Sequence, residues 1–72
     1  MKIPSYLKKL GLNIFLKRKG EHLSQSELAY RANIDINYLG EIERGEANPS
    51  TKVLKKICKP LKTNISILTK GV

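Results

Sequence analysis

Apolar residues recur along this chain at helical spacing, and the pattern predicts five helices and no strand. The first apolar stripe consists of Leu7, Leu10 and Ile14, which stand at positions i, i+3 and i+7. We expect the helix that carries this stripe to span residues 5–19, with Ser5 as its N-terminal cap and Gly20 as its stop.

Two short helices are expected next, close together in the sequence. Ser24 and Glu27 form a capping-box pattern, in which each side chain satisfies the other residue's free backbone N–H, so the second helix should begin there. Its narrow inner face consists of Leu28, Ala29 and Ala32. Asn33 should end it, because asparagine tolerates a left-handed backbone. The third helix should be capped by Asp35 and stopped by Gly45. Its inward side should carry Leu39, Ile42 and the stem of Glu43.

Two further helices complete the pattern. Ser50 should cap the fourth helix, and Pro60 should end or kink it near Cys58 or Lys59, because proline removes a helical hydrogen bond. Asn64 should cap a short fifth helix. The fourth helix should turn Val53, Leu54, Ile57, Cys58 and Leu61 inward and Lys52, Lys55, Lys56 and Lys59 towards water. The fifth helix carries Ile65, Ile67 and Leu68. We therefore expect one compact all-α domain over residues 1–72.

The residue types present argue against several kinds of site. A single cysteine, Cys58, cannot form an internal disulfide, and no Cys or His cluster has metal-ligand spacing, so we expect no metal and no cofactor. His22 is expected in an exposed turn and Cys58 in the core. No nucleophile, base and orienting partner recur at usable spacing, so an enzyme is not expected. The lone Cys58 indicates a reducing compartment, most simply the cytoplasm. No apolar run approaches the roughly 20 residues needed to cross a bilayer, so we expect a soluble protein.

The net charge favours a polyanionic partner. The 72 residues include 14 Lys and Arg against six Asp and Glu, for a net charge of +8. This balance favours nucleic acid ahead of an acidic membrane surface. The alternative is a lysine-rich domain that binds no polyanion.

The two short helices also carry a recognisable motif. Two helices joined by a tight turn in a basic all-α domain are typical of a helix-turn-helix, whose second helix lies in the DNA major groove. The segments LSQSELA and NYLGEIERGEANPS, with LGLNI ahead of them, resemble the Cro and lambda-repressor (XRE-like) regulators from about Leu10 to Leu68. The resemblance implies a five-helix transcriptional regulator of double-stranded DNA, usually a homodimer on a palindromic operator. Prophage repressors, restriction-modification controller proteins and antitoxins all share this pattern, and the sequence does not choose among them.

The resemblance also implies roles for individual residues. Gln25, at the start of the second helix, would contact the DNA backbone or a base edge. Arg18 and Glu43 would form an internal ion pair. The implied groove-facing residues are Ile36, Asn37, Gly40 and Glu41, and the implied backbone contacts are Tyr38, Arg44 and Asn48. The chemistry agrees in part, since asparagine suits an adenine edge, isoleucine can meet a thymine methyl group and glutamate can accept from cytosine N4.

The third helix departs from the usual family pattern. Gly40 weakens it by about 1 kcal/mol relative to alanine, and is either a point of close approach to the groove or a tolerated small residue. Glu41 and Glu46 place negative charge on the face that should meet phosphate.

The first helix departs from the pattern as well. Leu12, Phe15 and Leu16 stand opposite the inward stripe, where the family is usually polar. Either these residues form a second contact surface, or the helix is shifted and some of them pack under Ile3 and Tyr6. The rival to a DNA-binding regulator is thus a protein-interaction module of the same fold, with a partner at Leu12, Phe15 and Leu16.

Overall fold

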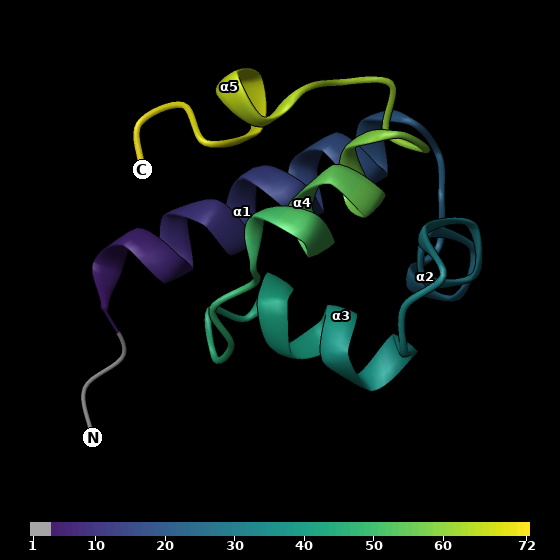
Figure 1. The fold of residues 1–72 in the computed structure, drawn as a ribbon, viewed down its shortest axis with the longest axis horizontal. Helices are drawn as coiled ribbons and strands as arrows, with labels where there is room; N and C mark the ends of the chain where they lie inside the picture. The colour runs from purple at the N-terminus through teal and green to yellow at the C-terminus, as the bar shows by residue number, and fades with distance from the viewer. Residues whose placement is uncertain (1–3) are drawn as a thin grey trace.

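The computed structural model describes residues 4–72, and within them the chain forms helices and no strand (Figure 1). The elements are α1 (Ser5–Gly20), α2 (Gln25–Ala32), α3 (Ile36–Glu43), α4 (Thr51–Cys58) and α5 (Ile65–Leu68). The long helix α1 contacts both α3 and α5, which lie on different sides of it in Figure 1. The expected all-α architecture of five helices is confirmed for this part of the chain.

Four of the predicted helix caps are confirmed. The side chains of Ser24, Asp35, Ser50 and Asn64 all accept hydrogen bonds from backbone N–H groups in the first turn of the helix that follows. These bonds satisfy donors that have no partner inside the helix. Asn33 ends α2 in the left-handed conformation, with φ of 56°. Gly45 follows α3 with φ of 78°, and α4 ends at Cys58, ahead of Pro60.

The predicted ends of α1 need correction. Ser5 is the first helical residue rather than the cap, because Pro4 occupies the capping position, where no side chain bonds the helix. Proline suits a helix start because its missing N–H would have no partner there. The helix runs one residue past the predicted 5–19, to Gly20, and the left-handed residue that turns the chain is His22, with φ of 58°. His22 is exposed, as expected.

The predicted stripes meet in one hydrophobic core. Its largest fully buried side chains are Ile14, Leu28, Leu39, Ile42, Ile57 and Leu61. Cys58 is buried among them, and this burial raises the pKa of its thiol. Cys58 is therefore a core residue, as predicted. Val53 was expected to be buried and Lys56 to be exposed, but both side chains are half buried.

Two glycines let α1 pack closely against the end of α3. A Cβ atom on Gly11 would overlap the backbone carbonyl groups of Ile42 and Glu43. A Cβ atom on Gly45 would lie 2.9 Å from the Cα atom of Lys8. Neither neighbour is the mobile end of a side chain, so both positions require glycine, and α3 is fixed to α1 through backbone contact.

The C-terminal segment is attached to α1 by one side chain. Nδ2 of Asn13 donates hydrogen bonds to the carbonyl oxygens of Leu68, at 2.9 Å, and Lys70, at 3.0 Å. No helix within residues 4–72 is long and apolar enough to cross a membrane.

Candidate nucleic-acid interface

The helices α2 and α3 pack together as a helix-turn-helix unit. Ala29 and Ala32 are buried, so their small side chains allow the two helices to approach closely. In the turn, the backbone N–H of Ile34 donates to the carbonyl oxygen of Ala29 at 3.0 Å, and the Ile34 side chain packs against the core. The orientation of α3 is therefore set by α2, the turn and the core together.

One face of α3 carries three of the predicted site residues. Asn37, Glu41 and Arg44 stand at positions i, i+4 and i+7, and all three are exposed. Ile36, in the first turn, is 42% exposed although it is apolar. Asn48 is exposed in the loop that follows α3. An exposed surface of this composition can offer an amide, a carboxylate, a guanidinium and an apolar group to a neighbouring molecule.

Two other predicted residues of α3 are less accessible. Tyr38 is half buried and packs against the core. Gly40 is buried, and a Cβ atom there would lie 3.0 Å from Nη1 of Arg44, so the guanidinium group folds over this glycine. The small residue at position 40 thus makes room for the Arg44 side chain.

Gln25 takes part in an internal network. Its Nε2 atom donates to Oε1 of Glu43 at 3.0 Å, which links the start of α2 to the end of α3. Its amide oxygen accepts no hydrogen bond from residues 4–72. One Nε2 hydrogen and the amide oxygen therefore stay available for an outside partner.

The predicted ion pair between Arg18 and Glu43 is confirmed and is bidentate. Nε of Arg18 lies 2.7 Å from Oε2 of Glu43, and Nη2 donates to Oε1 at 3.0 Å. A third bond runs from Nη1 to the carbonyl oxygen of Leu23 at 2.9 Å. The Arg18 and Glu43 side chains are only 7% and 4% exposed. Such a buried, bidentate pair holds α1 against the helix-turn-helix unit.

Phe15 shelters the same pair. The Cζ atom of Arg18 lies 5.3 Å from the centre of the Phe15 ring, within range of a cation–π contact. Phe15 is still 38% exposed, and Leu12 and Leu16 beside it are 45% and 56% exposed. All three therefore lie on the outer face of α1. Ile3, which the alternative interpretation placed against them, lies outside the described residues.

The charge of Arg44 is partly balanced by a neighbour. Its Nε atom lies 3.0 Å from Oε2 of Glu46, and both side chains are about half exposed. The hydrogen bond from Arg44 lowers the pKa of the Glu46 carboxyl group, and the same bond raises the pKa of Arg44. Both groups are therefore ionised near neutral pH, and a phosphate that approaches Arg44 must compete with Glu46.

The basic residues lie largely outside the helix-turn-helix unit. Residues 25–44 contain two arginines and four acidic residues, whereas the lysines of the described chain lie on α1, on α4 and in the residues that follow α4. Within residues 4–72, no cluster of three or more His, Cys, Asp or Glu is arranged to hold a metal ion. The site is thus a mixed polar surface beside basic helices.

Comparison with known proteins identifies the family. The sequence model of the helix-turn-helix family HTH_3 matches residues 14–68, which is most of the chain. The chain belongs to this helix-turn-helix family. The predicted resemblance and the predicted fold are therefore confirmed.

Three relatives of this helix-turn-helix protein are informative. It is 41% identical over 61 residues to the "ImmF control region 10 kDa protein" of Bacillus phage phi105, which covers 85% of this chain and 68% of the relative. It is 36% identical over 59 residues to the "Immunity repressor protein" of the same phage, which covers 82% of this chain and 41% of that protein. The crystal structure of the restriction-modification controller protein C.AhdI from Aeromonas hydrophila superposes with a TM-score of 0.88 at 31% identity, covering 90% of this chain and 98% of that one.

Membership of the helix-turn-helix family defines the general class of this protein. The family consists of DNA-binding transcriptional regulators, repressors among them, and these are not enzymes. The sequence predicted the exposed residues of α3, the caps of α2 and α3, and the Arg18–Glu43 pair. It missed the bond between Gln25 and Glu43, because no local pattern indicates a contact between residues 18 positions apart.

Proposed function

We propose that this protein is a sequence-specific regulator that inserts α3 into the major groove of double-stranded DNA. The observation that carries the proposal is the surface of α3, where Ile36, Asn37 and Glu41 are exposed on a helix held by α2 and by the buried Arg18–Glu43 pair. Direct readout needs side chains that reach base edges from a support that does not move.

The exposed residues differ in the contacts that they can make. Asn37 lies in the first turn of α3 and carries both a donor and an acceptor, as an adenine edge requires. Ile36 can meet a thymine methyl group, and Glu41 can accept from cytosine N4. Arg44 and Asn48 flank the helix and are the proposed phosphate contacts, since such contacts fix register without reading sequence.

Three remaining residues have supporting roles. Gln25 is proposed to contact a phosphate through its second Nε2 hydrogen while its first remains bonded to Glu43. Tyr38 is proposed to reach the DNA backbone only with its exposed edge. Gly40 acts by leaving space for Arg44, so that the guanidinium can lie close to the groove.

A homodimer on a palindromic operator completes the proposal. One α3 helix reads only a few base pairs, and a second copy would double the contacts at a half-site about one helical turn, roughly 34 Å, away. DNA as the partner implies action in the cytoplasm of a prokaryotic host, and the phage relative is consistent with that setting.

Binding selection from randomised duplex, followed by titration with salt, tests the proposal. We expect enrichment of one inverted repeat and a linear fall of log K with log salt, at a slope near −0.9 for each phosphate contacted. No enriched sequence together with no salt dependence would show that the protein does not act on DNA in this way.

The outer face of α1 supports a second candidate function, a protein-interaction module. Leu12, Phe15 and Leu16 are all more than a third exposed, although exposed side chains of this size are seldom grouped on a small domain without a contact role. Under this alternative a protein partner binds the face, and DNA binding is weak or lost. Retention of sequence-specific binding in the selection above would reject the alternative as the main function.

A further inference from the structure

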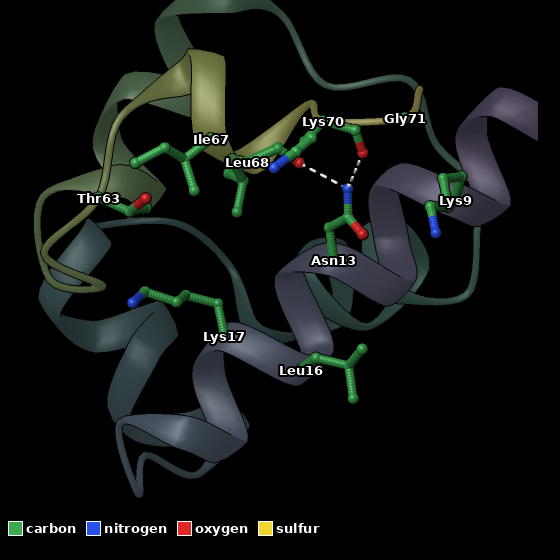
Figure 2. A pocket seen from close by; sticks show the side chains of 9 residues that line it. All are labelled: Lys9, Asn13, Leu16, Lys17, Thr63, Ile67, Leu68, Lys70 and Gly71. Carbon is green, nitrogen blue, oxygen red and sulfur yellow. Dashed lines mark hydrogen bonds between the residues drawn. The ribbon is translucent and has the colours of Figure 1, made fainter.

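A groove lies between α1 and the C-terminal segment (Figure 2). In Figure 1, α5 and α3 lie on different sides of α1. The volume of the groove is about 560 Å³. The two hydrogen bonds from Asn13 to the carbonyl oxygens of Leu68 and Lys70 hold its walls together, as Figure 2 shows. The groove is therefore a built feature of the fold, on a side of α1 that the proposed DNA contact does not use.

The lining of the groove combines apolar and basic side chains. Leu16 and Ile67 line it and are 56% and 58% exposed, so two large apolar side chains from different elements stand open in the same groove. Three lysines also line it, Lys9, Lys17 and Lys70, and no acidic residue does. Nζ of Lys17 lies 3.9 Å from Oε2 of Glu21. Neither Lys9 nor Lys70 has an ion-pair partner within residues 4–72.

We propose that this groove binds an acidic amphipathic helix of a partner protein. Its apolar side chains would cover Leu16 and Ile67, and its carboxylates would meet Lys9, Lys17 and Lys70. The apolar surface continues from Leu16 to Leu12, one turn earlier on α1 and 45% exposed, so a helix laid along α1 would find apolar contacts over its length.

Charge decides which occupant fits. A second copy of this chain, with a net charge of +8, would bring basic side chains against the same three lysines unless it offered one of its few acidic residues. An acidic helix gains attraction from the lysines that repel a basic one, and rim charges of this kind select partners and speed association. The proposal gives a partner to the α1 surface described above and does not depend on whether α3 binds DNA.

Fluorescence anisotropy with a labelled model peptide tests the proposal on the whole protein. The probe is an amphipathic helix with leucines at i, i+3, i+4 and i+7 and glutamates on both flanks. The matched control replaces every glutamate by lysine. We expect the acidic peptide to bind with an affinity that falls as salt is added, and the basic peptide not to bind.

Variants of the protein locate the binding site. Leu16→Ala and Ile67→Ala should each weaken the acidic peptide about tenfold, which corresponds to about 1.4 kcal/mol, whereas Tyr30→Ala, at an exposed aromatic residue of α2, should not. Lys9→Glu and Lys70→Glu should weaken binding and reduce its salt dependence. The control is Lys52→Glu on α4, which makes the same charge change outside the groove. Circular dichroism confirms that each variant is folded.

Three results would overturn the proposal. Equal binding of both peptides would show that the lysines do not select the partner. Equal loss in Lys52→Glu and Lys9→Glu would show that only net charge matters. Conversion of a dimer to a monomer by Leu16→Glu, seen by light scattering, would show that a second copy fills the groove. Duplex binding by the same variants, measured separately, distinguishes these results from failure of the DNA-binding proposal.

Discussion

Arg18 and Glu43 meet in a bidentate ion pair, with Nε and Oε2 2.7 Å apart, although one residue lies near the end of α1 and the other at the end of α3. The guanidinium also donates to the Leu23 carbonyl oxygen, and the carboxylate also accepts from Gln25. The pair thus connects α1, the segment before α2 and both helices of the helix-turn-helix unit.

Removing one partner of this pair should destabilise the protein strongly. Glu43→Gln leaves the Arg18 charge buried and uncompensated, which typically costs about 3–5 kcal/mol. Urea denaturation measures the free energy of unfolding. The control is Glu46→Gln, which breaks the exposed pair with Arg44 and should leave the midpoint almost unchanged. Equal midpoints for Glu43→Gln and the wild type would show that the pair does not contribute in this way.

Gly11→Ala should also destabilise the domain. The new methyl group would overlap the carbonyl groups of Ile42 and Glu43, and overpacking of this kind costs about 1–3 kcal/mol or more. Gly20→Ala is the matched control, because no atom lies within 4 Å of a Cβ at that position. The same denaturation measurement compares them, and a Gly11→Ala variant as stable as Gly20→Ala would contradict the close contact of α1 with α3.

The capping box of α2 should respond to acid. Hydrogen bonds from the backbone and the side chain of Ser24 lower the pKa of Glu27, so this carboxylate stabilises the fold above its ordinary pKa and loses its contribution as the pH falls through the lowered value. An NMR titration should show a lower pKa for Glu27 than for an ordinary glutamate. Ser24→Ala should move it back upwards and cost about 1 kcal/mol of stability at neutral pH. An unchanged titration in Ser24→Ala would show that the cap does not act on Glu27.

Asn37 and Arg44 should affect DNA binding differently. Asn37→Ala should cost about 1–3 kcal/mol on the selected operator and little on random duplex, because only base contacts carry sequence information. Arg44→Ala should weaken both duplexes alike and flatten the salt slope by about one unit. Affinities for the two duplexes at several salt concentrations separate these effects. If Asn37→Ala and the wild type select the same sequence with the same affinity, then Ile36 or Glu41 is the better candidate reader.

Glu46→Gln should strengthen binding to any duplex. It removes a negative charge and releases the Arg44 guanidinium from its 3.0 Å contact, so Arg44 can reach a phosphate. Glu21→Gln changes the net charge equally at the end of α1, near Lys17, and serves as the control. A similar gain in both variants would attribute the effect to net charge alone.

The apolar face of α1 is best tested at Leu12. Phe15→Glu would place a carboxylate beside Arg18, where it would compete with Glu43. A loss of association in this variant could then result from lost stability rather than from the altered face. Leu12→Glu lies on the same outer face, and Leu12 is 45% exposed. We expect it to abolish the binding of a protein partner through this face, measured by fluorescence anisotropy with the acidic peptide, while the helical circular dichroism signal stays intact. Loss of the helical signal would show that the face belongs to the core.

Local chemistry accounts for what the sequence predicted correctly. Ser24, Asp35, Ser50 and Asn64 bond to N–H groups two or three residues away, so a cap can be recognised from neighbouring letters alone. The left-handed Asn33 was predictable for the same reason. The prediction that Ser5 caps α1 was wrong, because the neighbouring Pro4 also suits a helix start and occupies the capping position.

Contacts between distant residues could not be found in this way. The overlap that makes glycine necessary at position 11 involves carbonyl groups more than thirty positions away, and nothing near Gly11 in the sequence indicates it. Asn13 bonds to Leu68 and Lys70, which lie 55 and 57 positions away, so nothing near Asn13 in the sequence indicates the groove beside α5. The Arg18–Glu43 pair was predicted only because the family resemblance supplied the long-range information.

The backbone contact at Gly11 has a consequence for genetics. A genetic selection for loss of regulation would recover substitutions of Gly11 and Arg18 as well as of Asn37, although only Asn37 of these three is proposed to contact DNA. A map of such mutants would therefore extend along α1 and overstate the DNA footprint. Second-site suppressors should separate the two groups, since a substitution that stabilises the core would rescue a mildly destabilised α1 variant but could not restore a missing base contact.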